Sequence, residues 1–221
     1  MTAISTFRTF IKPYCHQCPN AVIDDQIVET LIDFCRDTLI LELDASAISI
    51  LEDTAEYTPV FSSGSYKVLK IIHALLGDGT DDDTPIEITS QWYLDQTGPY
   101  WKRQTTSEDF THVFLTMDGD IRVYPIPDDD LTDTLLLKVA VMPKSDATEV
   151  DDLIYNDHRQ AIRAGVLSEI LGQTGKIWTN LKEAANQEIK YEKFKADAKG
   201  LSRQGNGNVS MVAGYSGSTM F

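Results

Sequence analysis

The chain has 221 residues, of which 42% are hydrophobic, and its formal net charge is −15. This length allows a buried core and the composition is typical of a globular protein, while no apolar run approaches the roughly 18 residues of a membrane span. The acids concentrate in residues 44–157, which hold 23 Asp and Glu against 7 Lys and Arg, whereas residues 158–221 hold 5 against 9. Because an acidic surface repels phosphates, a sequence-reading DNA-binding role is disfavoured, but a surface past which DNA slides is not.

The N-terminus lacks the basic head and apolar middle of a signal peptide. The three cysteines are an odd number, which argues against a disulfide framework. We therefore expect synthesis in a reducing cytoplasm and no membrane insertion.

The first 43 residues are predicted to form helices. Residues 2–12 give a short apolar helix, which Pro13 breaks because proline cannot continue the hydrogen-bond pattern. Residues 24–41 carry apolar side chains at helical spacing. Asp24 and Asp25 stand at the start of this segment, where the helix dipole favours acids.

From Ala45 the apolar period changes from helical to alternating, which predicts β structure. Residues 111–124 are the clearest hairpin, because Asp118 and Gly119 between two apolar runs suit a tight turn with positive backbone angles. Strands at this spacing predict a small antiparallel sheet or sandwich. The other expected strands span residues 46–58, 66–76, 86–94 and 135–142.

The last third of the chain predicts two antiparallel helices. In residues 153–171 apolar side chains recur at three- and four-residue steps, after Asp151 and Asp152, which suit a cap and a first turn. Gly172 and Gly175 are expected to end this helix.

The second of these helices begins at Asn180 and Glu183, which resemble a capping box. Lysines gather near its end and suit the dipole there. The expected apolar stripe consists of Leu181, Ala184, Ala185, Ile189 and Phe194, and the basic stripe of Lys190, Lys193, Lys195 and Lys199.

These elements predict an α+β fold. Residues 1–43 and 151–200 would pack as a small helical bundle, with residues 44–150 inserted as an acidic antiparallel β-sheet or sandwich domain. Residues 201–221 form a Gly-, Ser- and Asn-rich tail that is expected to be flexible and to become ordered on a partner. Its apolar anchors are Val209, Met211, Val212, Tyr215, Met220 and Phe221.

Motifs that would carry chemistry are weak. Cys15 and Cys18 form a CxxC that could be redox-active or half a zinc site, but no second CxxC follows, and we interpret it as a tight loop with semi-buried thiols. The sequence lacks the common hydrolase, metalloprotease and nucleotide-binding motifs, so we expect neither an enzyme nor a metal or other cofactor.

Two features leave a binding module open as an alternative. The aspartates at Asp78, at 81–83 and at 128–130 could bind calcium, but neither group fits the EF-hand pattern, and solvated loops are the favoured interpretation. A cluster of aromatics could line a sugar-binding face or serve as core and interface anchors. These aromatics are Trp92, Tyr93, Tyr100 and Trp101.

Three segments resemble the phage head-to-tail adaptor, or connector, family. Residues 13–38 (PYCHQCPNAVIDDQIVETLIDFCRDT) are similar to its Pro-Cys-Pro loop and following helix, and residues 118–129 (DGDIRVYPIPDD) to its hairpin with a Tyr-Pro-x-Pro run. Residues 139–180 are similar to its strand, Pro-Ser turn, Ala-Ile-x-x-Gly helix and Gly-Lys-x-Trp turn. The three segments occur in the family's order.

The resemblance implies a structural virion protein at the head-tail junction. Members form dodecameric rings below the portal, extend the DNA channel and offer a platform to the tail. The expected partners are then other copies of the chain, the portal protein and a downstream tail or nozzle protein. Genome DNA is expected to pass through without specific binding. The lysine stripe and tail anchors given above would dock on the portal, and Trp92, Tyr93, Tyr100, Trp101 and Asp128, Asp129 and Asp130 would contact the tail or a neighbour. The alternative remains a calcium-dependent β-rich binding module.

Overall fold

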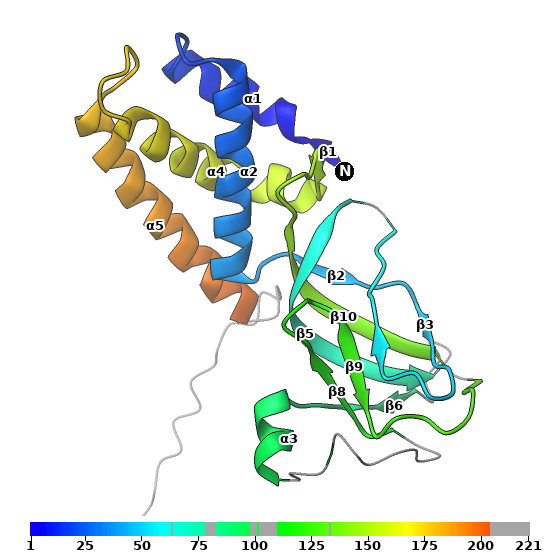
Figure 1. Ribbon diagram of the computed structural model, residues 1–221. Helices are drawn as coiled ribbons and strands as arrows, with labels where there is room; N and C mark the ends of the chain where they lie inside the picture. Colours follow the sequence, from blue (N-terminus) through cyan, green and yellow to red (C-terminus); the bar gives the residue numbers. More distant parts are fainter. Residues whose placement is uncertain (63, 78–82, 98–100, 102–109, 133, 204–221) are drawn as a thin grey trace, which may run out of the picture.

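The computed structural model describes residues 1–62, 64–77, 83–97, 101, 110–132 and 134–203. Helices lie toward both ends of the chain and most strands between them, which confirms the predicted α+β class. Figure 1 shows most of the helices gathered at one end of an elongated molecule and most of the strands at the other.

The helical part joins segments from both ends of the sequence. Helix α2 packs against α4 and α5, and α4 and α5 run side by side (Figure 1). The helices are η1 (Ile4–Phe7), α1 (Arg8–Ile11), η2 (Lys12–Tyr14), α2 (Asn20–Thr38), α4 (Asp152–Gly172) and α5 (Leu181–Arg203).

Helix α2 begins four residues earlier than predicted, directly after Pro19. The acids expected to open it therefore lie beyond its first turn, and Asp24 instead accepts a hydrogen bond from Arg8 of α1 (Nε–Oδ1 2.9 Å). The helix ends because Leu39 adopts a left-handed conformation (φ 53°), in which its N–H donates to the carbonyl of Cys35 (2.9 Å).

The predicted starts of both C-terminal helices are confirmed. The Asp151 carboxylate accepts from the backbone N–H of Leu153 (2.8 Å) and caps α4. The Asn180 side chain accepts from the N–H of Glu183 (3.2 Å) before α5. Only this half of the capping box forms, because the Glu183 carboxylate accepts from Gln187 one turn further on (2.7 Å). Helix α5 continues to Arg203, three residues into the segment that we predicted as tail.

Two long antiparallel strands form the centre of the β part, β5 (Tyr66–Gly77) and β10 (Thr134–Pro143), as predicted. Their register shifts after Lys138 and after Ala140. Such irregularities bend a strand pair, and in Figure 1 this pair curves up toward the helices.

The described residues form three sheets. The long pair belongs to the sheet β2-β10-β5-β6, with β3 also on β10; the other two sheets are β4-β9-β8-β7 and the pair β1-β11. The β7–β8 pair is parallel, so the prediction of a wholly antiparallel sheet is wrong there. A long connection through helix α3 precedes β8 and permits that orientation. The short strands are β1 (Thr2–Ala3), β2 (Glu42–Asp44), β3 (Ile48–Ser49), β4 (Glu56–Tyr57), β6 (Thr84–Pro85), β7 (Glu87–Ile88), β8 (His112–Leu115), β9 (Ile121–Tyr124) and β11 (Glu149–Val150).

Two predicted strands are only partly correct. The segment 46–58 contains β3 and β4 separated by a turn at Asp53, whose φ of 54° no strand accommodates. The segment 86–94 contains β7 and then enters helix α3 (Gln91–Thr97). The hydroxyl of Ser90 accepts from the backbone N–H three residues later (3.2 Å), which is a capping interaction that favours the helix.

The hairpin of β8 and β9 is confirmed, although its loop is longer than the predicted two-residue turn. Leu115 lies opposite Ile121, and the Thr116 N–H donates to the Asp120 carbonyl (2.9 Å) across the loop. Gly119 supplies the positive φ of 97°.

One connected set of buried side chains runs through both parts of the molecule. It includes Phe34 of α2, Leu41 after it, Val139 of β10, Ile121 of β9 and Ile162 of α4, each 1% exposed or less. The boundaries at 43/44 and 150/151 between a helical and an inserted β domain therefore stay predictions.

Candidate interaction surfaces

The aspartate loop at 128–130 is built into the end of the β part. The Asp130 carboxylate accepts from the N–H of Glu52 (2.8 Å), and Asp129 accepts from the N–H of Asp130 (2.8 Å). These two carboxylates therefore hold the backbone of adjoining loops. Within the described ranges no three His, Cys, Asp or Glu side chains gather where they could hold a metal ion. Asp78, Asp81 and Asp82 lie outside those ranges.

The four aromatics do not form one surface. Trp101 is buried (4% exposed), donates from Nε1 to Asp95 (2.8 Å) and packs edge-on against Phe114 and Tyr124. The prediction that Trp101 is a surface contact is therefore not supported, because its ring fills a small core of its own. Trp92 is 71% exposed and Tyr93 48% exposed on α3, and Tyr100 lies outside the described residues.

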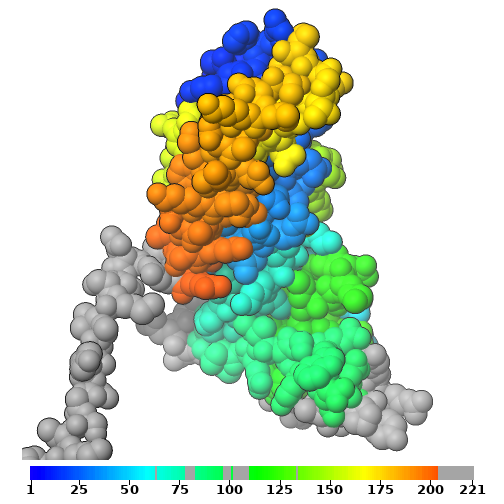
Figure 2. All heavy atoms as spheres, turned by 90° about the vertical axis from the view of Figure 1, so that its left-hand side faces the viewer, coloured from blue at the N-terminus to red at the C-terminus, as the bar shows by residue number. Residues whose placement is uncertain are grey.

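The predicted apolar stripe of α5 is wrong except at Ala184, which is buried. Leu181 is 59% exposed, Ile189 71% and Phe194 37%, so most of the predicted stripe faces solvent. Figure 2 shows α5, coloured orange, running down the outside of the helical part. The residues that α5 buries are Ala184, Gln187, Tyr191, Lys195 and Ala198.

Lys195 does not belong to the exposed basic stripe that we predicted. Its side chain is 9% exposed, and its Nζ contacts Asp33 (3.1 Å) and Asp37 of α2. The Tyr191 hydroxyl donates to the same Asp33 carboxylate (3.0 Å). Of the other predicted lysines, Lys190 and Lys193 are exposed and Lys199 is half-buried.

Electrostatics strengthens this α2–α5 cluster. Burial by itself would lower the pKa of Lys195, but hydrogen bonds to Asp37 and Asp33 outweigh it and raise the pKa to about 12. The hydrogen bond from Lys195 lowers the pKa of Asp37. Burial, with the nearby Asp33, raises the pKa of Tyr191, so its hydroxyl stays a donor. The cluster therefore holds α5 onto α2 through a charged Lys195–Asp37 pair and a neutral Tyr191 hydroxyl.

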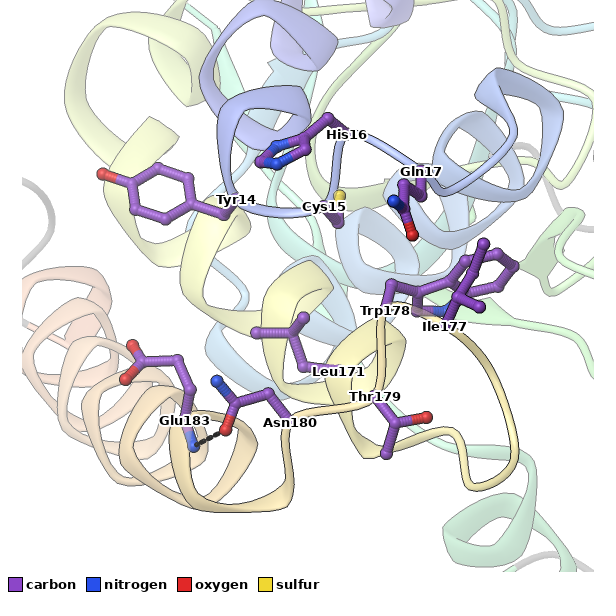
Figure 3. Close-up of a pocket in the computed structure, with 10 residues that line it drawn as sticks. All are labelled: Tyr14, Cys15, His16, Gln17, Leu171, Ile177, Trp178, Thr179, Asn180 and Glu183. Atoms are coloured by element: carbon purple, nitrogen blue, oxygen red, sulfur yellow. Dashed lines mark hydrogen bonds between the residues drawn. The ribbon is translucent and has the colours of Figure 1, made fainter.

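A hollow of about 420 Å³ opens between the CxxC loop and the α4–α5 turn (Figure 3). The Trp178 Nε1 atom is buried without a hydrogen-bond partner among the described residues, and the Arg163 guanidinium stacks over the Tyr14 ring (5.4 Å). The lining residues are Tyr14, Cys15, His16, Gln17, Leu171, Ile177, Trp178, Thr179, Asn180 and Glu183.

The cysteines are placed as packing residues. Cys15, Cys18 and Cys35 are at most 2% exposed, and none is in a disulfide. Burial raises the pKa of Cys15 to about 11 and that of Cys35 to about 12. The reactive thiolate is therefore scarce at neutral pH.

We expect the native protein at pH 7.5 to react with a thiol reagent such as 5,5′-dithiobis(2-nitrobenzoate) at least about tenfold more slowly than the same protein in guanidinium chloride. The released chromophore measures the rate. A Met117→Cys variant is the control, because position 117 is 96% exposed and its added thiol should react at once. Rapid reaction of the unsubstituted protein would contradict the packing role.

Sequence reasoning missed the inward face of α5. Gln187, Tyr191 and Lys195 are polar, so a search for apolar periodicity passes over them although all three are buried. The available signal was the acid pair Asp33 and Asp37, one turn apart on α2 and opposite in charge to Lys195.

The comparisons with known proteins agree with the resemblance seen in the sequence. In the part of the chain that the structure describes, no helix has the length and apolar character needed to cross a membrane. A search of curated proteins gave no match. Residues 4–214 match the family model described as SU10 adaptor protein, a range that takes in the helical part, the β part and residues beyond the end of α5. The predicted family is thereby confirmed: the chain belongs to the SU10 adaptor family and is a structural adaptor protein of a bacteriophage.

Proposed function

We propose that this chain forms the ring directly below the portal, where it extends the DNA channel and gives the tail its platform. The observation that carries the proposal is the family match over residues 4–214. In this role the chain assembles with copies of itself into a dodecameric ring at the head-tail junction of the virion. Its other partners are the portal protein and a downstream tail or nozzle protein.

The acidic charge of the β part supports a channel function. Asp44, Asp53, Asp118 and Asp128 are exposed, and none of them forms an ion pair with a cation among the described residues. A wall of unpaired carboxylates repels DNA phosphates at short range. Genome DNA therefore passes such a wall without specific binding.

The end of α5 supports attachment to the portal. The Ser202 hydroxyl donates to the Leu39 carbonyl (3.1 Å), which fixes the end of α5 against the end of α2. Leu201 is 46% exposed beside this point, and Arg203 is exposed. The tail follows this fixed, partly apolar and cationic end in the sequence, and we propose that its anchors, with Lys190 and Lys199, dock on the portal.

The exposed residues of α3 support contact with the tail or a neighbour. Trp92 and Tyr93 lie on this helix at the end of the β part, away from the helical bundle (Figure 1). Exposed aromatics are frequent anchors of protein interfaces. We propose that α3 and the aspartate loop at 128–130 form this second contact surface.

The experiment compares three proteins mixed with the portal ring of the same phage. These are the full chain, a chain that ends at Arg203, and a full-length chain in which every tail anchor is serine. We expect the full chain to add copies to the portal in native mass spectrometry, and both variants to bind at least about tenfold more weakly, because apolar anchors dominate the energy of such contacts. The anchors are Val209, Met211, Val212, Tyr215, Met220 and Phe221.

Thermal melting of the three proteins is the control for folding, and equal melting temperatures are expected. If both variants bind the portal as the full chain does, the tail is not the anchor. If the full chain itself does not bind the portal, the proposed function is wrong.

A further inference from the structure

The outer face of α5 is an apolar and cationic surface that the described residues leave uncovered. We define it by Leu181, Lys182, Ala185, Ile189 and Lys193, all exposed. Residues at three- and four-residue steps lie on one side of a helix, so these five form a continuous surface. Leu181 is 59% exposed and Ile189 71%. Neither lysine pairs with a carboxylate in the ranges that the structure describes.

The opposite side of the helical part carries an acidic hollow of about 410 Å³. Its apolar floor includes Ile4 and Val28, and Asp25 and Asp146 stand at its edge. Asp24 also lines it but is neutralised by Arg8. Asp25 and Asp146 form no ion pair within the described residues; Asp146 only accepts a long hydrogen bond from Ser65 (3.4 Å). The hollow therefore combines apolar contact area with two uncompensated negative charges.

We propose that the outer face of α5 of one copy docks in the acidic hollow of the next copy. Ile189 or Leu181 would cover the apolar floor, while Lys182 and Lys193 would approach Asp25 and Asp146. Exposed apolar side chains flanked by cations match an apolar floor flanked by carboxylates in both polarity and charge. Among the possible occupants, this complementarity favours a second copy of the chain, because both halves of the contact are present on one molecule.

The positions of the two surfaces fit this arrangement. Figure 1 shows α5 on the left of the helical part and η1, β1 and the segment before β11 on its right, with α2 and α4 between them. A contact between two different surfaces that face away from each other continues from copy to copy, and it closes into a ring when the rotation allows. The inference rests on the proposed function, since the ring below the portal is where such a contact repeats.

The first test is cross-linking between copies. Ile189→Cys and Ser145→Cys are prepared as separate single variants, because Ser145 lines the hollow and is exposed. They are mixed, assembled on the portal ring and treated with a short bismaleimide. We expect covalent dimers that contain one copy of each variant, at least about tenfold more abundant than in a mixture of Met117→Cys with Ser145→Cys. The buried native cysteines leave a low background.

The second test is charge reversal. Lys182→Glu with Lys193→Glu should reduce ring formation on the portal at least about tenfold, because like charges then face each other. Asp25→Lys with Asp146→Lys should do the same, and a mixture of the two double variants should restore the contact between unlike copies. These positions are exposed, so folding should be retained, which thermal melting checks.

The outcomes separate the two proposals. If the unsubstituted chain assembles on the portal but no heterodimer forms and neither reversal changes assembly, the α5 contact is wrong and the proposed function stands. If the unsubstituted chain does not assemble on the portal, the proposed function is wrong, and the α5 contact, which rests on it, is overturned with it. A cross-link between α5 and the portal protein in place of a second copy would assign this face to the portal and overturn the inference.

Discussion

Replacing Gly165 by alanine is expected to lower the free energy of unfolding by about 2 kcal/mol, which corresponds to a fall in melting temperature of about 4–8 °C for a chain of this size. A Cβ atom at this position in α4 would stand 2.6 Å from the Thr30 methyl group and 2.9 Å from the Tyr191 ring. Contacts this short force atoms apart. The gain in helix propensity of alanine over glycine, about 1 kcal/mol, offsets only part of that cost.

The two neighbours cannot move aside easily. The Thr30 hydroxyl donates to the Gln26 carbonyl (2.8 Å), and the Tyr191 hydroxyl donates to Asp33 (3.0 Å). Both side chains are therefore fixed, and relief requires α4 to separate from α2 and α5. Gly165 therefore lies where α4 is in close contact with both α2 and α5.

Gly200→Ala is the matched control, because a Cβ there meets no atom within 4 Å. Gly200 lies in α5 and is exposed, so alanine should leave stability unchanged or raise it by up to about 1 kcal/mol. Denaturant unfolding followed by circular dichroism measures both variants. Equal stabilities of the two variants would contradict the close approach at Gly165.

Replacing Lys195 by methionine is expected to cost about 2 kcal/mol of stability and to loosen α5. Methionine retains the apolar stem, so the loss reports the charge. Removing the cation takes away the partner that Asp33 and Asp37 share. Among the described residues, Asp33 then keeps only the Tyr191 hydroxyl (3.0 Å) and Arg36 (3.6 Å). Loss of one member of a fully buried pair costs about 3–5 kcal/mol, and the lower value follows because these carboxylates are 39% and 37% exposed.

This loss should depend on pH in a defined way. Because the folded-state pKa of Asp37 is lowered by Lys195, the stabilisation is present above the ordinary pKa of 3.8 and is lost as pH falls below it. Because the pKa of Lys195 is raised to about 12, the stabilisation is also complete below its ordinary value of 10.5. The difference between the unsubstituted chain and Lys195→Met should thus be constant between roughly pH 5 and 10 and shrink at pH 3.

Urea unfolding at pH 3, 7 and 9 measures this difference. Lys190→Met serves as the control, since Lys190 is exposed on the same helix and its loss should change stability by less than about 0.5 kcal/mol at every pH. A Lys195→Met variant as stable as Lys190→Met at pH 7 would show that the cluster contributes nothing.

The sequence predicted best where local signals agree with tertiary packing. The long strands β5 and β10 combine alternating apolar residues with β-branched ones, and both were correct over nearly their whole length. The start of α4 depended on one side chain, Asp151, and a cap is a local interaction. The family resemblance was carried by short motifs in a fixed order. Such motifs can be recognised in the sequence even when the packing of the chain is unknown.

The errors share a physical cause. Ser90 begins a helix where alternation predicted a strand, because a single capping hydroxyl competes with a weak apolar pattern over a short segment. Leu181 and Ile189 were assigned to the core of the bundle because apolar residues usually are, yet α5 turns its small and polar side chains inward.

The sequence by itself therefore determined the fold class, the main helices and strands, the family and the uneven distribution of charge. Only the tertiary structure decided which side of α5 is buried and that Lys195 is a structural cation and not part of an exposed stripe. It also decided that Trp101 is a core residue and that an acidic hollow lies opposite an apolar and cationic face. Burial depends on what the rest of the chain presents at each position. Tyr191 and Lys195 are buried because they contact Asp33, Asp37 and Gly165. These contacts join residues that lie far apart in the sequence.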